Sequence, residues 1–214
     1  MGSDLTGKTQ ESLARAQLRS SNVTLFHDMM VTKWHVETPV AGSGDILRVI
    51  EEQHLRNFLL WHTEDEARRR DVPDSFIAEQ KRKIDRFNQE RQDYIERIDE
   101  TIIRSWPWVA ENAALPMNTE TPGSVIDRLS IASLKMFHMR EETERTDATD
   151  EHRRKCMEKL EILRRQRGDL AAALDQLLDD LHDRRKRLQV YRQFKMYNDP
   201  TLNPAVYKNR ERQA

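Results

Sequence analysis

A repeat of isoleucine with a period of seven residues constrains the fold of this chain more than any other feature of the sequence. Two neighbouring rows carry it, namely Ile77, Ile84, Arg91 and Ile98 in the first, and Lys81, Asn88, Ile95 and Ile102 in the second. On an α-helix these rows form one face, so the stretch predicts a helix that packs by its isoleucines. Asn88 and Arg91 lie in the middle of that face. Because burial of an amide or a charge is costly without hydrogen-bond partners, the pattern predicts a polar layer inside a helical core.

The balance of charged and helix-breaking residues indicates long amphipathic helices. Lys and Arg (36) nearly match Asp and Glu (37) in a chain of 214 residues that contains only six Gly and seven Pro. The net charge of −1 argues against a nucleic-acid coat and against a polybasic membrane surface. The basic run at 184–187 is typical of a solvated helix end.

The cellular setting is predicted from what the sequence lacks. No apolar run reaches the length of about 18–20 residues that a membrane span needs, and the first residues have no apolar core of a signal peptide. The single cysteine, Cys156, excludes an internal disulfide. We therefore expect a cytoplasmic protein without membrane insertion.

Periodicity and turn residues divide the chain into helices, which we expect at about 9–19, 22–36, 45–70, 74–105, 121–146 and from 150 to about 188. The two short turns, at 71–74 and 147–150, make the helices beside them antiparallel neighbours. The sequence thus predicts an all-α fold: an antiparallel helical bundle of two long helical hairpins, with N-terminal helices and an irregular C-terminal strap from Tyr191. Residues 1–44 would form the N-terminal helices and a loop, and residues 45–214 the bundle with its strap, in a single domain overall.

Antiparallel pairing about each turn indicates which polar residues meet. His54 falls opposite Arg91 in the first hairpin, and Arg167 falls within about one turn of Asp127 and Ser130 in the second. If the hairpins pack face to face, one layer contains His54, Asn88, Arg91, Asp127, Ser130 and Arg167. Two interpretations stay open. The layer is either a network that fixes helix register or an anion pocket whose two guanidiniums hold phosphate or carboxylate.

Acidic residues at helical spacing suggest a metal site. Glu51 and His54 have the i, i+3 spacing of di-iron bundles, and Glu96 and Asp99 would face them from the next helix. A di-iron site requires a second Glu-x-x-His, which the sequence lacks, since His138 precedes its glutamates. Mg²⁺ on an acidic cluster, as in all-α nucleotide pyrophosphatases, is the second interpretation. A solvated acidic face paired with Arg and Lys is the third.

Two further groups are candidates for chemistry. His62 falls near Asp85 across the first hairpin and would form a base–orienter pair with it, with Asp65 as a further base or metal ligand. A packed or surface histidine is the alternative. In the C-terminal tail, Lys195 and Asn198 would close over the end of the bundle and touch a ligand, or would act only as a clamp.

Several motifs along the chain occur in the same order as in a known family. They are Trp61-His62-x-Glu64-Asp65-x-x-Arg68; Ile84-Asp85, Asn88-Gln89, Arg91 and Asp93; Asn118-Thr119-Glu120-x-Pro122 with Ile126-Asp127-Arg128-Leu129-Ser130; His138-Met139; Gln166-Arg167-x-Asp169-Leu170; and Lys195-Met196-Tyr197-Asn198-Asp199 with Leu202-Asn203-Pro204. Over about residues 54–207 they resemble the bacterial family called domain of unknown function 4254 (DUF4254). The stretch Thr121-Pro122-Gly123-Ser124 departs from relatives, which are closer to Ser-Pro-Ala-Trp. Members often lie near glycosyltransferases of envelope polysaccharides, which implies a neighbourhood and no particular activity.

Together with the resemblance, these residues predict a bacterial enzyme that acts on an anionic, phosphorylated or nucleotide-sugar-like small molecule in envelope polysaccharide metabolism. Mg²⁺ is the candidate cofactor. The candidate ligand-binding residues are Asn88, Arg91, Asp127, Arg128, Arg167, Lys195 and Asn198. The alternative is a non-enzymatic assembly protein that binds itself or glycosyltransferases through the apolar seam from Leu160 to Leu188, which repeats in steps of four and three. A homo-oligomer is expected.

Overall fold

The computed structural model describes residues 15–38, 46–194, 196, 199 and 201–205, and these residues form helices and no strand. The helices are α2 (Ser20–Trp34), α3 (Ile46–Glu66), α4 (Asp74–Ser105), the short 3₁₀ helix η1 (Pro107–Ala110), α5 (Pro122–Glu144) and α6 (Asp150–His182). The all-α bundle is therefore confirmed. The helix expected at 9–19 lies largely outside the described residues. Within the described part of the chain, no helix has the length and apolar character needed to cross a membrane.

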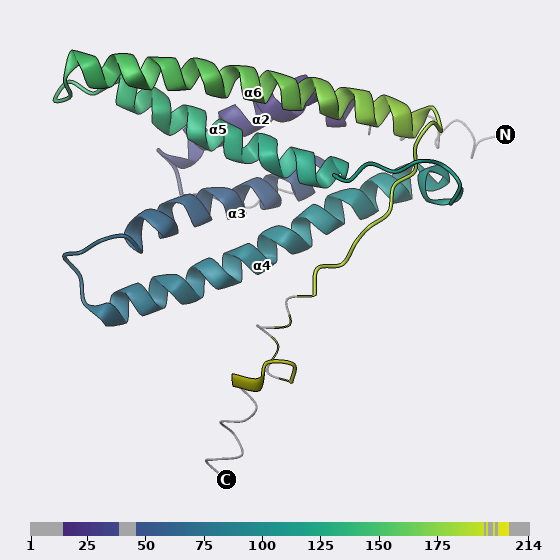
Figure 1. Cartoon of the computed structure of the whole chain (residues 1–214), viewed down its shortest axis with the longest axis horizontal. Coiled ribbons are helices and arrows are strands. Elements are labelled where there is room, and N and C mark those ends of the chain that lie inside the picture. Colours follow the sequence, from purple (N-terminus) through teal and green to yellow (C-terminus); the bar gives the residue numbers. More distant parts are fainter. Residues whose placement is uncertain (1–14, 39–45, 195, 197–198, 200, 206–214) are drawn as a thin grey trace, which may run out of the picture.

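Two antiparallel hairpins build the bundle (Figure 1). One consists of α3 and α4, the other of α5 and α6, and α5 lies between α6 and the first hairpin. α2 packs mainly on α5 and also contacts α3 and α6. Toward their turns the two hairpins diverge, so that only the C-terminal half of α4 comes close to α5 (Figure 1).

Side-chain caps begin both helices of the second hairpin. The Thr121 hydroxyl accepts a hydrogen bond from the Ser124 N–H at 3.2 Å, and Pro122 occupies the first turn of α5. Thr149 caps α6 in the same way, through the His152 N–H at 3.2 Å. The helix start predicted at Thr121 and Pro122 is confirmed.

Gly123 brings the start of α5 against α4. Its N–H donates to Asp99 Oδ1 at 2.8 Å, and a Cβ at this position would lie 2.5 Å from the carbonyl oxygen of Ile95. A side chain does not fit this approach without a backbone shift.

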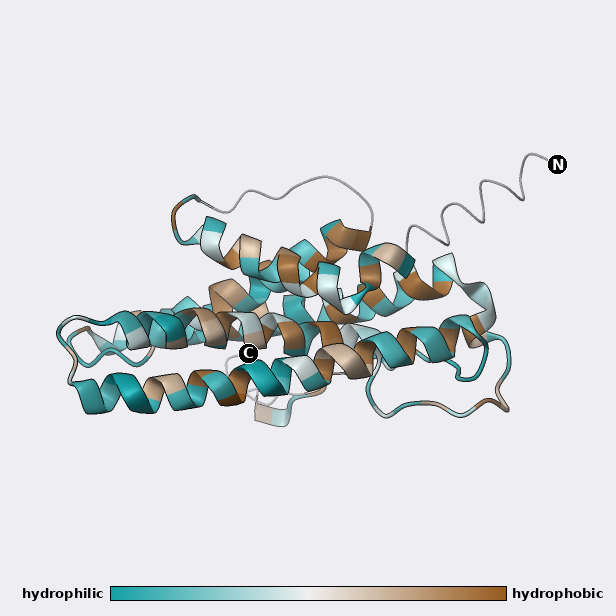
Figure 2. Ribbon diagram, turned by 90° about the horizontal axis from the view of Figure 1, so that it is seen from above, coloured by the Kyte–Doolittle hydropathy of each residue, from teal (hydrophilic) through white to brown (hydrophobic). Residues whose placement is uncertain are grey.

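The main core lies where the two hairpins and α2 meet. Its buried side chains include Ile98 and Ile102 of α4, Ile126 and Leu129 of α5, and Leu174 and Leu178 of α6. The opposite end of the isoleucine face is different, because Lys81 is exposed where α4 extends away from α5. Figure 2 shows hydrophobic and hydrophilic residues alternating along each helix, which is the pattern of amphipathic helices.

The end of α6 differs from the expected one near Leu188. The helix ends at His182, and Arg184 has a left-handed backbone with φ of 58°. The N–H groups of Arg184 and Arg185 donate to carbonyls in the last turn of α6 at 3.2 and 2.8 Å, which closes a Schellman motif. Leu188 is buried all the same, because its N–H donates to the Val109 carbonyl at 2.7 Å and holds the loop against the core. The position of Leu188 in the repeat of four and three residues therefore did not show that it belongs to the helix.

The first residues of the C-terminal strap pack against α4. The Arg192 guanidinium donates to Glu96 at 2.9 Å, and the Gln193 N–H donates to the same carboxylate at 3.0 Å. Phe194 beyond them is 83% exposed and takes no part in the core. Lys195 and Asn198, predicted to touch a ligand, lie outside the described residues.

Candidate functional site

The predicted polar layer forms around one carboxylate, that of Asp127 on α5. Its Oδ1 accepts hydrogen bonds from Arg91 Nε at 2.7 Å, Gln53 Nε2 at 2.5 Å and Asn57 Nδ2 at 2.9 Å, and its Oδ2 accepts one from Arg91 Nη2. Asp127 is only 4% exposed. The buried charge is therefore held by a two-pronged arginine and two amides from α3.

A second set of bonds extends the layer toward α2. His54 bonds to the Ser130 hydroxyl at 2.6 Å through Nδ1 and to the His27 carbonyl at 3.1 Å through Nε2, and Asn57 Nδ2 donates to Ser130 at 2.8 Å. Burial lowers the pKa of His54 to about 3, so its ring is neutral. Since a carbonyl only accepts, the proton lies on Nε2, and Nδ1 accepts from Ser130.

Arg167 belongs to a separate cluster, which corrects the single layer expected from the sequence. Its guanidinium donates to both carboxylate oxygens of Asp28 on α2, at 2.7 and 2.8 Å, and to Ser133 at 3.4 Å. The hairpin geometry had left α2 out, and α2 supplies the partner. Because His27 and Asp28 are consecutive, the two clusters meet along α2 and together reach α2, α3, α4, α5 and α6.

Both arginines thus have carboxylate partners within the protein. The Arg91 guanidinium gives two of its nitrogens to Asp127, and that hydrogen bonding raises its pKa. Arg167 is similarly engaged by Asp28. These pairings favour the register-network interpretation over a pocket in which the two guanidiniums share a bound anion.

Three adjoining hollows lie against α5, and residues of α3, α4 and α6 complete their linings. The first, of about 330 Å³, is lined by Asn57, Leu60, Trp61, Glu64, Asp65, Arg68, Asn88, Arg91, Ile131 and Leu134. The second, of about 640 Å³, is lined by Glu120, Arg128, Ile131, Ala132, Lys135, Leu163, Gln166, Asp169, Leu170 and Ala173. The third, of about 460 Å³, is lined by Trp61, Lys135, His138, Met139, Glu142, Lys159, Ile162 and Leu163. Shared lining residues join them into one depression, which we call the cleft.

Three of the predicted ligand-binding residues line the cleft, whereas Asp127 and Arg167 do not. Asn88 and Arg91 line the first hollow, and Arg91 also belongs to the polar layer through its bond to Asp127. Arg128 lines the second hollow and is paired with Glu120 at 2.5 Å. Of the polar layer, Asn57 and Arg91 therefore reach the cleft, in its first hollow.

The predicted catalytic residues are not brought together. Asp85 is half exposed and pairs with Lys81 at 2.6 Å, on its own helix. Asp65 lies on the rim of the cleft, and His62 packs toward α2 and α5. Among the charged groups that shift the pKa of His62 are Asp65 and Glu141, and Asp85 is absent from them. The base–orienter pair of His62 with Asp85 is consequently not formed.

The predicted metal ligands also have other partners. Both ring nitrogens of His54 are used within the polar layer, so none is left for a metal. Glu96 holds the strap, and Asp99 accepts the N–H at the start of α5. Glu51 lies 3.8 Å from Arg48. Helical spacing alone placed these four side chains on facing helices without revealing these competing partners.

The structure assembles a different group, made of His35 beside the end of α2, His62 on α3 and His138 on α5. One ring nitrogen from each lies within 4.8 Å of the others. Sequence reasoning missed this group because its members are far apart in the chain and share no spacing motif. One signal was present: Glu141 follows His138 at i+3, and its carboxylate bonds to His138 Nδ1 at 2.8 Å.

Comparison with known proteins identifies the family. The model of a protein family of unknown function, DUF4254, matches residues 47–190, about two thirds of the chain. The chain belongs to the DUF4254 family. No curated protein and no solved structure matches it significantly. The DUF4254 match includes Asp127, its partners from α3 and α4, and the whole lining of the cleft, whereas α2 lies outside it.

Proposed function

We propose that this DUF4254 protein is an enzyme that binds an anionic, phosphorylated or nucleotide-sugar-like small molecule in the cleft. The observation that carries the proposal is a pair of exposed lysines, Lys135 and Lys159, on the rim of the third hollow. Within the described residues neither has an ion-pair partner, although other helix lysines do, such as Lys155 with Glu151 at 2.7 Å. Two ammonium groups without an ion pair at the mouth of a hollow, which Glu142 also lines, favour an anionic ligand.

The surface between the lysines suits a ligand with an apolar or planar body. Trp61, Met139 and Ile162 are among the side chains that line the third hollow, whose volume of about 460 Å³ is typical of small-molecule sites. The adjoining first hollow offers the amides of Asn57 and Asn88, which suit hydroxyl groups. A phosphate near the lysines and a sugar or base along the cleft would use both surfaces.

The proposal changes the roles expected of the arginines. Arg91 and Arg167 would position the helices below the cleft through Asp127 and Asp28. A setting in bacterial cytoplasmic envelope metabolism, with Mg²⁺ arriving together with a phosphorylated substrate, is part of the same proposal.

The alternative, an assembly protein, relied on the apolar seam of the last helix. Leu160, Leu174 and Leu177 of that seam are buried against the protein's own core. Self-association or binding of glycosyltransferases would therefore require another surface.

A thermal-shift screen of nucleotides, sugar nucleotides and sugar phosphates, each with and without Mg²⁺, tests the proposal. A ligand at one hundred times its Kd stabilises the folded state by about 2.7 kcal/mol, which is roughly 5–10 °C for a chain of this size. The shift should disappear in Lys135→Ala/Lys159→Ala and persist in Lys155→Ala, a control on the same helix as Lys159.

Each outcome of the screen bears on the proposal. Phosphorus NMR of the best ligand, incubated with the protein, would show turnover. The absence of a shift with every compound would contradict ligand binding. A shift that the double lysine variant retains in full would contradict the placement of the ligand.

A further inference from the structure

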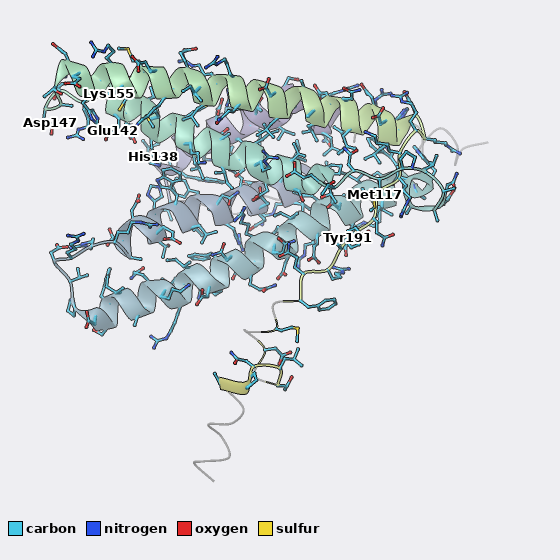
Figure 3. The ribbon with its side chains drawn as sticks, viewed as in Figure 1. Met117, His138, Glu142, Asp147, Lys155 and Tyr191 are labelled. Carbon is cyan, nitrogen blue, oxygen red and sulfur yellow. The ribbon has the colours of Figure 1, made fainter. Side chains whose placement is uncertain are left out.

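Three histidines, one just after α2, one on α3 and one on α5, converge beside the cleft. The ring centroids of His35 and His62 are 5.1 Å apart, those of His35 and His138 are 5.2 Å apart, and those of His62 and His138 are 5.5 Å apart. One ring nitrogen of each lies within 4.8 Å of the other two. Figure 3 labels His138 on α5.

Hydrogen bonds to Nδ1 orient two of the rings. His35 Nδ1 bonds to the Val31 carbonyl at 2.7 Å, and His138 Nδ1 bonds to a carboxylate oxygen of Glu141 at 2.8 Å. Because a carbonyl and a carboxylate accept, each Nδ1 carries the proton, and each Nε2 of the neutral ring presents a lone pair. Metal-bound histidines are typically fixed in this way, with the second nitrogen bonded to a carbonyl or carboxylate.

The inward nitrogens have no partner of their own. Nε2 of His35, of His62 and of His138 is in each case buried without a hydrogen bond to any described residue. A buried polar nitrogen normally finds a partner, so three orphans in one place call for a common one. A cation is a single partner that can bind all three nitrogens at once.

We propose that His35, His62 and His138 bind a transition-metal ion, with Zn²⁺ the best match and a fourth coordination position left open. Zn–N bonds of about 2.0–2.1 Å place tetrahedral ligand nitrogens about 3.3 Å apart, which small ring rotations can reach from the present separation. Three imidazoles suit Zn²⁺, Cu²⁺ or Ni²⁺ and not Mg²⁺, which takes oxygen ligands. Three protein ligands with one open position are typical of catalytic zinc.

The surroundings fit a bound cation. Asp65 and Glu141 are the carboxylates whose negative charge acts on His62, and the same charges favour a cation held by that ring. Trp61 stacks on His138 at 4.8 Å with an interplanar angle of 8°, and Phe137 stacks on His35 at 4.1 Å. These aromatic faces hold the rings in place, as a preformed site requires.

A second group of potential ligands is weaker. Glu142, His152 and Cys156 also lie within 4.8 Å of one another. Their atoms already satisfy one another, because His152 Nε2 is 2.8 Å from Glu142 and 3.4 Å from Cys156 Sγ. The three-histidine group has no such internal bonds and is the better site.

The metal site adjoins the proposed ligand site. Trp61 lines both the first and the third hollow and stacks on His138, which itself lines the third hollow, so a metal bound to the three histidines would adjoin the cleft. Hydrolysis of a phosphate ester or a related bond is the reaction class that a metal-activated water would supply to the proposed ligand. That use of the metal rests on the proposed function, whereas metal binding itself does not.

Metal content and calorimetry on the full chain test the site. After treatment with a chelator and dialysis against Zn²⁺, the protein should retain one equivalent, and Co²⁺ in its place should give the visible absorption of a four-coordinate site. His62→Ala and His138→Ala should each abolish retention. His152→Ala is the matched control, because it removes a histidine of the second group and should leave Zn²⁺ binding unchanged.

A milder variant guards against misfolding of the histidine variants. Glu141 is exposed, so Glu141→Gln should fold normally while it weakens Zn²⁺ binding roughly 10- to 100-fold through its hold on His138. Wild type that retains no Zn²⁺, or affinity that is lost in His152→Ala and kept in the other variants, would overturn the proposal. If the protein binds Zn²⁺ but no phosphorylated compound raises its melting temperature, the metal site stands and only the proposed function is contradicted.

Discussion

Removal of Arg91 should be far more damaging than removal of Arg167, although both pair with an aspartate. The Asp127 side chain is 6% exposed beside Arg91, whereas the Asp28 side chain is 45% exposed beside Arg167. In Arg91→Ala the Asp127 carboxylate stays buried with only the amides of α3 to hold it. In Arg167→Ala the Asp28 carboxylate can be hydrated where it stands.

The structure sets the expected magnitudes. A buried charge that loses its partner costs about 3–5 kcal/mol, and an exposed pair is worth about 0–1 kcal/mol. Gln53 and Asn57 still donate to Asp127, so we expect Arg91→Ala to cost about 3 kcal/mol and Arg167→Ala about 1 kcal/mol. Adding Asp127→Asn to Arg91→Met should restore most of the loss, because no buried charge remains and the amide still accepts.

Urea unfolding followed by far-UV circular dichroism gives the free energy of unfolding of each variant by linear extrapolation. The m-value should stay unchanged, since the same surface is exposed on unfolding. If Arg91→Ala costs no more than Arg167→Ala, the claim that Arg91 neutralises a buried carboxylate is wrong. A failure of Asp127→Asn to rescue Arg91→Met would show that the loss comes from packing.

Three further predictions concern single positions on α4, on α5 and at the cap of α6. Burial raises the pKa of Asp99 to about 6 from an ordinary value of 3.8, so the folded state binds its proton more tightly and should lose up to about 3 kcal/mol of stability as pH rises between these values. Asp99→Asn should lack this component, so urea unfolding across that range should show the variant gaining on wild type toward neutral pH; parallel curves would argue against the shift. Gly123→Ala should lower stability by about 1–3 kcal/mol, because its Cβ would meet the Ile95 carbonyl, and an unchanged melting temperature would show that α5 moves freely. Thr149→Ala removes the cap of α6 and should cost about 1 kcal/mol, seen as a lower melting temperature, whereas Thr149→Ser should keep the cap.

Local chemistry made the helices predictable from the sequence. Proline, cap residues and apolar periodicity lie within each element, so the hairpins and the cap at Thr121 followed from neighbours in the chain. Arg91 and Asp127 were expected in one layer, but pairing about the turns placed Asp127 beside Arg167, whereas its arginine comes from the other hairpin. The seven-residue repeat of isoleucine predicted buried residues of α4 correctly where the two hairpins are in contact, as at Ile98 and Ile102.

Long-range packing limited the rest of the prediction. The place of α2 depends on a connection that no motif describes, and α2 supplies Asp28 to Arg167. The same helix ends beside His35, so the histidine group was invisible without its packing against α3 and α5. Leu188 was assigned to a helix because burial in a loop and burial on a helix leave the same mark in a sequence.

The role of Lys135 and Lys159 in ligand binding is the central claim, and NMR of the protein with ¹³C-methylated lysines tests it most directly. The signals of these two lysines can be assigned by single substitution, with Lys155 as an internal reference on the same helix as Lys159. On titration with the most stabilising phosphorylated compound, we predict saturable shifts of the Lys135 and Lys159 signals and none for Lys155. Equal shifts of all three, or shifts confined to lysines outside the cleft, would contradict the account.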